Sequence, residues 1–90
     1  MLREIDIENL LKKRVKEKGG VALKMHPYRA GVPDRLCVMP GGEVIWVELK
    51  RPGQKPTKLQ AHWHRTLQAL DHELAVLDSP EAVENFVREL

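Results

Sequence analysis

Two apolar segments joined by a proline–glycine turn constrain the fold of this chain more than any other feature. Residues 35–40, RLCVMP, and residues 43–50, EVIWVELK, are rich in large apolar and β-branched residues, as strands are. Pro40-Gly41-Gly42 between them is a turn sequence, so we predict an antiparallel hairpin. Glu48 and Lys50 interrupt the second segment, although charge in a buried strand is costly unless it finds a partner. These two residues therefore have either a structural or a chemical role.

The remaining segments predict an α/β fold. Further β-like segments are residues 21–26 and 73–78, and residues 27–33, PYRAGVP, and 51–56, RPGQKP, are loops. Helices are predicted over residues 5–18, 57–70 and 79–90, with apolar stripes at helical spacing. The stripes are Ile7, Leu10, Leu11 and Val15; Leu59, Trp63, Leu67 and Leu70; and Val83, Phe86, Val87 and Leu90. The order is α-β-β-β-α-β-α, a mixed sheet flanked by helices.

Size and composition limit the organisation. Ninety residues suffice for one modest core, so we expect a single domain over residues 1–90. No apolar run approaches the roughly 20 residues of a membrane span, and the N-terminus has no signal-peptide h-region, so we expect a cytoplasmic protein. The lone Cys37 has apolar neighbours and is expected to be an inert core thiol.

Positive charge is clustered in two places, although the net charge of +2 is too small to indicate a nucleic-acid partner by itself. The first cluster lies on the first predicted helix and is better explained as a solvated helix face. Its members are Lys12, Lys13, Arg14, Lys16 and Lys18. The second cluster flanks the charged strand and is a candidate phosphate-contacting surface. Its members are Lys50, Arg51, Lys55 and Lys58.

The hairpin is expected to bring three charged residues together. Asp34 stands just before its first strand and Glu48 lies near the end of its second, and antiparallel pairing places these two ends side by side. Lys50 shares the face of Glu48 because strand side chains alternate. Two carboxylates with a lysine suit Mg²⁺, which takes oxygen ligands, retains waters and binds substrate phosphate. An Asp–Lys–Glu ion-pair cluster at the strand end is the alternative.

The surrounding sequence resembles a known nuclease family. Pro33-Asp34 followed by Glu48-Leu49-Lys50 is the PD-(D/E)xK arrangement. GVPDR at residues 31–35, VELKRPGQKPT at residues 47–57 and Leu59-Gln60 resemble the VRR-NUC family, in particular its minimal standalone versions in phages and bacteria. The resemblance covers essentially the whole chain and implies a single VRR-NUC nuclease domain with a restriction-endonuclease-like core.

The resemblance also implies roles for individual residues. Asp34 and Glu48 become metal ligands, with the backbone carbonyl of Leu49 as a third. Lys50 becomes the residue that positions water, and Gln60 a site residue carried by a helix. Glu8 matches an acidic residue on the first helix that joins the catalytic and metal-binding groups.

Several of these residues also fit a purely structural role. Gln60 completes a capping box with Thr57, and Glu8 could pair with Lys12 one helical turn away. Arg35 is expected to bind either a phosphate or a carboxylate. Trp46 and Trp63 are expected in the core, and the four histidines show no zinc-like spacing with cysteine. The candidate DNA contacts are Arg35, Arg51, Lys55 and Lys58.

The function implied by the resemblance is Mg²⁺- or Mn²⁺-dependent endonucleolytic hydrolysis of DNA, in the host cytoplasm if the chain is phage-encoded. Recognition should follow DNA shape, with Holliday junctions as the first expectation and flap-type or non-specific cleavage as the alternative. A nuclease-fold module that binds DNA without cutting it is a further alternative, against which the intact set of Asp34, Glu48 and Lys50 argues. Small nucleases of this fold act as two-fold dimers, so we expect a homodimer whose interface uses apolar residues of the last or the first helix.

Overall fold

The structure is a computed structural model that describes residues 1–26 and 29–90. Its elements are α1 (Glu4–Glu17), β1 (Val21–Lys24), β2 (Arg35–Val38), the 3₁₀ turn η1 (Pro40–Gly42), β3 (Val44–Leu49), α2 (Lys58–Ala69), β4 (Glu73–Leu77) and α3 (Pro80–Arg88). This order confirms the predicted α-β-β-β-α-β-α sequence. In the predicted loop over residues 27–33, residues 29–33 are neither helix nor strand, and residues 27–28 lie outside the described residues.

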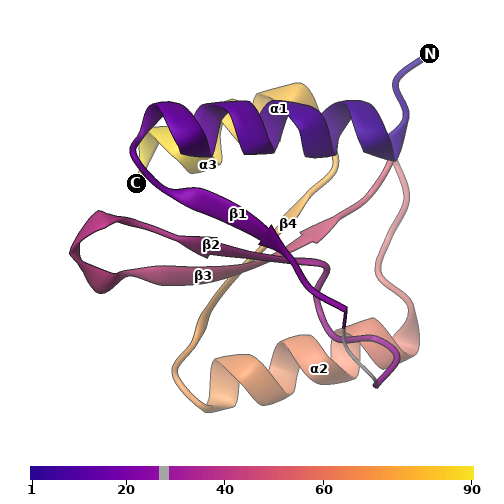
Figure 1. The fold of residues 1–90 in the computed structure, drawn as a ribbon. Coiled ribbons are helices and arrows are strands. Elements are labelled where there is room, and N and C mark those ends of the chain that lie inside the picture. Colours follow the sequence, from indigo (N-terminus) through magenta and orange to yellow (C-terminus); the bar gives the residue numbers. More distant parts are fainter. Residues whose placement is uncertain (27–28) are drawn as a thin grey trace.

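The strands form a mixed sheet in the order β1-β2-β3-β4 (Figure 1). The pairs β1–β2 and β2–β3 are antiparallel, whereas β3 and β4 are parallel and are connected through α2. The predicted hairpin is the β2–β3 pair, and its turn contains Gly41 and Gly42 at φ values of 88° and 89°. Both values lie in the left-handed region that favours glycine, which accounts for the Gly-Gly sequence.

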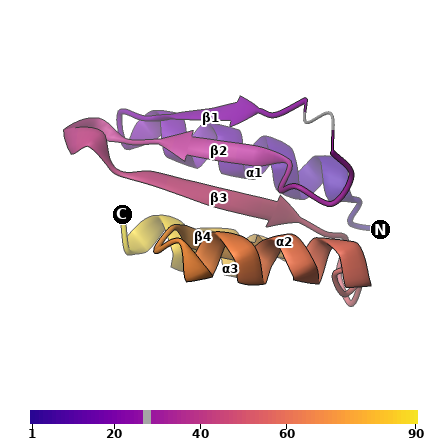
Figure 2. The same cartoon turned by 90° about the horizontal axis from the view of Figure 1, so that it is seen from below.

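Helices cover both faces of the sheet, as Figures 1 and 2 show. The helices α1 and α3 lie together on one face and α2 lies on the other. Between the sheet and the α1–α3 pair lies the hydrophobic core, whose fully or nearly fully buried members include Ile7, Leu11, Val15, Cys37, Ile45, Val47, Leu49, Leu77, Val83 and Val87. The predicted stripes of the first and last helices therefore form the core. Burial raises the pKa of the Cys37 thiol to about 11, which agrees with an inert thiol.

The apolar stripe predicted for α2 is wrong at its first and last residues, which are exposed rather than buried. Leu59 and Leu70 are 47% and 65% exposed, Trp63 is half-buried, and the buried side chain of this helix is His64. The physical reason is that α2 packs over the part of the sheet where β3 carries Glu48, so its inward side chains are polar. Trp46 on the same sheet face is also half-buried, and its Nε1 donates to Nδ1 of His72 at 3.2 Å.

The apolar residues of α1 and α3 are mostly used by the core. Val83 and Val87 of α3 are 0% and 7% exposed, and Ile7 and Leu11 of α1 are fully buried. Phe86 and Leu90 of α3 are half-buried and Ile5 of α1 is 44% exposed, so an interface on the first or the last helix stays a prediction. The part of the chain that the structure describes has no helix whose length and apolarity would allow it to cross a membrane.

Candidate active site

The hairpin register places Asp34 beside Glu48. Arg35 pairs with Val47, so the next residue on each side of the ladder is Asp34 opposite Glu48. The Glu48 side chain is 1% exposed. Its pKa is raised to about 8, first by burial and then by the hydrogen bond to Asp34 and the charge of Asp34. A half-buried and a buried carboxyl group thus lie together, as predicted from the hairpin, and near neutral pH the metal-free pair retains a proton.

Lys50 joins this pair from the end of β3. Its backbone N–H donates to the carbonyl oxygen of Leu77 at 3.0 Å, which extends the parallel pairing with β4 by one residue. The Lys50 side chain is buried. Its positive charge offsets part of the rise in the pKa of Glu48, so the ammonium group acts on that carboxyl group.

Gln60 closes the helix cap and also contacts Glu48, because the two ends of its amide have different partners. Its Oε1 accepts from the backbone N–H of Thr57 at 2.9 Å, and its own N–H donates to Thr57 Oγ1 at 3.2 Å, which completes the capping box. Its Nε2 donates to Oε2 of Glu48 at 3.4 Å. The cap orients the amide so that the nitrogen reaches the carboxylate.

His64 is a member of this cluster that the sequence pattern did not predict. Its Nε2 lies 3.6 Å from Oε1 of Glu48, and within the described ranges neither buried atom has a hydrogen-bond partner. Burial, followed by the charge of Lys50, lowers the pKa of His64. A usable signal exists in the sequence, since His64 follows Gln60 by four residues and so shares its face of α2. The spacing of histidines relative to cysteines, which bears only on zinc, does not reveal it.

Glu8 and Arg35 form a separate pair on the α1 side of the sheet. Glu8 Oε1 accepts from Arg35 Nη2 at 2.6 Å and its Oε2 lies 3.8 Å from Lys24 Nζ. Arg35 also donates from Nη1 to the carbonyl oxygen of Ala22 at 2.9 Å. Side chains alternate along an extended chain, so Arg35 points away from the face on which its neighbour Asp34 meets Glu48.

This pair corrects two predictions. Glu8 was expected at the metal or on Lys12, but its carboxylate is bound by Arg35 and Lys24. Arg35 is buried on a carboxylate, which is one of its two expected partners, and so it is not an exposed DNA contact. The reason is that strand alternation fixes where Arg35 points, and the packing of α1 then brings Glu8 to it.

The donors that remain fit a hard divalent cation. In the part of the chain that the structure describes, no three His, Cys, Asp or Glu side chains form a group that could hold a metal. Mg²⁺ and Mn²⁺ do not require such a cage, because one or two carboxylates suffice when water and a phosphate complete the shell. Asp34 and Glu48 supply the carboxylates, and the buried Oε1 of Glu48 has no hydrogen-bond partner among the described residues. This oxygen-rich set suits Mg²⁺ or Mn²⁺ better than Zn²⁺.

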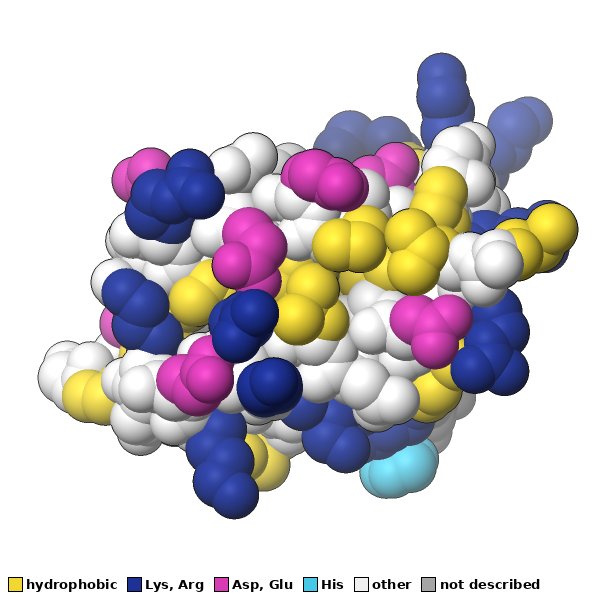
Figure 3. Space-filling model, turned by 90° about the horizontal axis from the view of Figure 1, so that it is seen from above, with side chains coloured by type: hydrophobic (Ala, Val, Ile, Leu, Met, Phe, Trp, Pro, Cys, Tyr) yellow, Lys and Arg dark blue, Asp and Glu magenta, His cyan; other side chains and the backbone are white. Residues whose placement is uncertain are grey.

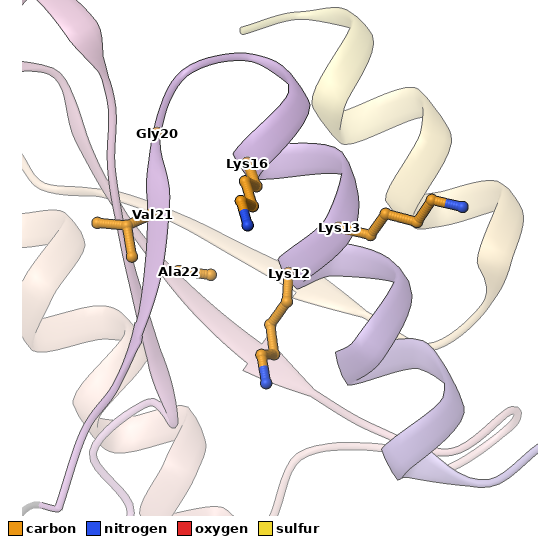
Figure 4. Close-up of a pocket in the computed structure, with 6 residues that line it drawn as sticks. All are labelled: Lys12, Lys13, Lys16, Gly20, Val21 and Ala22. Atoms are coloured by element: carbon orange, nitrogen blue, oxygen red, sulfur yellow. The ribbon is translucent and has the colours of Figure 1, made fainter.

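Two groups of exposed basic residues bear on nucleic-acid binding. Arg51, Lys55 and Lys58 are exposed in and after the loop that follows Lys50. Elsewhere, a groove of about 580 Å³ lies between α1 and β1 and is lined by Lys12, Lys13, Lys16, Gly20, Val21 and Ala22, with Lys13 directed away from β1 (Figure 4). On the face that carries α1 and α3, basic side chains are interspersed with acidic and hydrophobic ones (Figure 3). The loop cations are therefore the ones that follow Glu48 and Lys50 most closely along the chain.

Comparison with known proteins assigns this geometry to a family. No family model matches the chain. The chain is 48% identical over 82 residues to "Putative nuclease p44" of Acyrthosiphon pisum secondary endosymbiont phage 1, covering 90% of this chain and 88% of that protein. A solved structure described as a VRR_NUC domain superposes with a TM-score of 0.89 and 26% identity, covering 94% of each chain.

The mixed sheet with Asp34 and Glu48-Leu49-Lys50 at one end of its hairpin defines the class of PD-(D/E)xK nuclease folds. Within that class, the structural match to a VRR_NUC domain and the sequence match to a phage nuclease agree with each other. The chain belongs to the VRR-NUC family.

Proposed function

We propose that this protein is a Mg²⁺- or Mn²⁺-dependent DNA endonuclease that hydrolyses phosphodiester bonds in branched DNA, with Holliday junctions as its first substrate. The observation that carries the proposal is the position of half-buried Asp34 opposite buried Glu48 at the end of the hairpin, with the buried Lys50 two residues further on. Two neighbouring carboxylates, one of them buried, repel each other and lose hydration, which a divalent cation held by both would offset. The name of the phage relative, a nuclease, also supports hydrolysis of nucleic acid.

Each residue of the cluster has a part in this proposal. The cation would be held by the carboxylates of Asp34 and Glu48 and by the backbone carbonyl of Leu49. When bound, it supplies a Lewis acid that lowers the pKa of a water and stabilises charge on the phosphodiester. Lys50 donates a hydrogen bond that orients the attacking water. Gln60 holds the Oε2 edge of Glu48 and keeps that carboxylate in place.

The substrate part of the proposal rests on the exposed cations and on the chain's size. Arg51, Lys55 and Lys58 are exposed in and after the loop that follows Lys50, and from there they would contact phosphates that flank the scissile bond. Contacts of this kind read the shape of the backbone rather than the bases. Paired cuts in a junction need two centres at a fixed separation, so the proposal includes a homodimer.

A panel of DNA substrates tests the proposal. The protein is incubated with a four-way junction, a flap, a fork and plain duplex of matched sequence, each with Mg²⁺, Mn²⁺ or EDTA. We expect paired symmetric cuts in the junction, no cuts with EDTA, and no cuts by Asp34→Asn. Circular dichroism of Asp34→Asn should show an intact fold.

Other outcomes would point to other functions. Cutting confined to flaps would favour flap cleavage, and equal cutting of every substrate would favour a non-specific nuclease. DNA binding without cutting under any metal would favour a binding module. Cleavage by Asp34→Asn at the wild-type rate would show that Asp34 is not part of the active site.

A further inference from the structure

We propose that His64 is a positioning residue for Glu48, donating from Nε2–H to Oε1 while Gln60 donates to Oε2. The inference rests on the proposed function and extends it, because it adds a residue that sets how Glu48 faces the cation. His64 touches no substrate in this proposal and acts only through the carboxylate.

The first argument is that two buried polar atoms without hydrogen-bond partners among the described residues lie close to each other. Glu48 Oε1 and His64 Nε2 are 3.6 Å apart, their side chains are 1% and 11% exposed, and among the described residues neither atom has a hydrogen-bond partner. A buried acceptor and a buried donor without partners are both unfavourable, and each can satisfy the other. A shift of a few tenths of an ångström would bring the two atoms to the usual N–H···O distance. Ionised Glu48, the form that would hold a cation, can only accept, so in that form the hydrogen must be on Nε2.

The position of His64 on α2 is the second argument. Gln60 and His64 are one helical turn apart, and their side chains reach the two oxygens of the same carboxylate. The first turn of α2 is fixed by the capping box between Thr57 and Gln60. The helix therefore acts as a clamp on Glu48, and the lone pairs that remain free on its oxygens are those available to a cation and to Asp34.

The effect on metal binding follows from this geometry. Residues that hold a metal ligand in place usually contribute about 10-fold to 100-fold to metal affinity, although they do not contact the metal. Removing the donor at position 64 should release the Oε1 edge of Glu48. A substitution that keeps a donor nitrogen at a similar reach should restore the clamp.

Three variants and a metal titration test the inference. Mn²⁺ binding to the full chain is measured by electron paramagnetic resonance for wild type, His64→Leu, His64→Gln and His62→Leu. His62 is the matched control because it lies on the same helix and is exposed. We expect His64→Leu to bind Mn²⁺ about 10-fold more weakly, and His64→Gln and His62→Leu to bind within about threefold of wild type. Wild-type affinity in His64→Leu, or equal losses in His64→Leu and His64→Gln, would overturn the inference.

Nitrogen NMR supplies a readout that requires neither metal nor DNA. In ¹⁵N-labelled wild-type protein well above pH 8, where Glu48 is ionised without metal, we expect His64 as the Nε2–H tautomer, with an Nε2 shift that changes in Glu48→Gln while His62 stays the same. An Nδ1–H tautomer would overturn the inference even if the protein cuts DNA. A wild-type protein that shows the expected tautomer but binds no Mn²⁺ and cuts nothing would instead overturn the proposed function. The two failures are therefore distinguishable.

Discussion

At the scale of single residues, Glu48 has the most altered environment. The ordinary carboxyl pKa of 4.5 rises to about 8 in the folded protein, chiefly through burial. Below pH 4.5 the group is protonated in both the folded and the unfolded chain. Between pH 4.5 and 8 the folded chain holds the proton more tightly, so the free energy of unfolding falls as the pH rises through this window.

This linkage gives the first prediction. In EDTA, the wild-type protein should lose stability between pH 4.5 and 8, and Glu48→Gln should remove most of that loss because its amide does not titrate. At pH 8 the variant should be the more stable of the two, while its cleavage activity should be abolished. Thermal unfolding at several pH values checks the prediction. An identical pH slope in both proteins would place the titration on another group.

The second prediction distinguishes a lysine that acts in catalysis from a lysine that only contacts DNA phosphate. Lys50 is buried beside the carboxyl pair, whereas Lys58 is exposed. Lys50→Ala should lower turnover by at least about 100-fold with little change in DNA affinity, since the lost group acts near the transition state. Lys58→Ala should weaken DNA binding at low salt and reduce its salt dependence by about one phosphate contact.

The measurements are single-turnover rates and DNA affinities over a range of salt. Lys13→Ala is the control, because Lys13 is exposed on α1 and directed away from β1. If Lys50→Ala lost affinity and salt dependence as Lys58→Ala should, Lys50 would be a phosphate contact only.

At the scale of elements, α2 links helix stability to the site through Gln60. Gln60→Glu should keep the cap, because a carboxylate oxygen can accept from the Thr57 N–H and a negative charge suits a helix N-terminus. It should lose the amide donor to Glu48 and add a third carboxylate to the cluster. We therefore expect near-wild-type helix content at pH 8 with EDTA but strongly reduced cleavage.

Gln60→Ala is the companion variant, since it loses the side-chain bond to the Thr57 N–H and the donor to Glu48, while Thr57 still accepts from the backbone N–H of residue 60. It should cost about 1 kcal/mol of stability, the usual net value of a lost hydrogen bond. Circular dichroism, urea unfolding and cleavage rates distinguish the two variants. A fully active Gln60→Glu enzyme would reduce Gln60 to a helix cap.

The sequence was sufficient where a pattern is local. The Pro40-Gly41-Gly42 turn and the helix stripes of α1 and α3 are each contained in a few neighbouring residues, and all are observed. The proximity of Asp34 and Glu48 followed from the hairpin register. The partners of Glu8 did not follow, because they depend on which sheet face α1 covers. The place of His64 did not follow either, since the apolar stripe of α2 predicts an apolar surface beneath that helix, whereas a polar site lies there.

The loop before Asp34 is an element-scale constraint and gives the fourth prediction. Gly31 has a φ of 91°, and a Cβ there would lie 2.7 Å from Cγ of Leu59. Gly31→Ala should therefore cost about 1–3 kcal/mol through strain and displace the loop that leads to Asp34. The free energy of unfolding measured in urea and the affinity for Mn²⁺ should both be lower than in wild type. Gly53→Ala is the control, because its φ of 80° is also positive but a Cβ there has open space. An equal loss of Mn²⁺ affinity in both variants would contradict a specific role for the Gly31 contact.

At the scale of the whole molecule, the two sheet faces have different tasks. The α1–α3 face contains the hydrophobic core and the Glu8–Arg35 ion pair. The α2 face carries Glu48 with Gln60 and His64 packed against it. This separation lets one small domain keep its core apolar while it accepts an electrostatically costly cluster on the other side.

The last prediction is that the active unit is a homodimer. One cluster in a 10.3 kDa chain cannot place two opposed cuts in a junction, and a two-fold axis is the commonest way to pair two sites. Most apolar side chains of α1 and α3 pack in the core, so the interface has to use the apolar surface that remains. Exposed apolar side chains include Ile5 of α1, Val21 and Leu23 of β1 and Val44 of β3.

Light scattering at micromolar concentration should report about twice the 10.3 kDa chain mass. Paired cutting should fall steeply when the protein is diluted below the dimer dissociation constant, because each monomer then carries one centre. Mixing wild type with Asp34→Asn should yield junctions nicked on one strand, which a monomer acting twice would not produce in excess. A monomer that still cuts junctions symmetrically at nanomolar concentration would contradict the dimer.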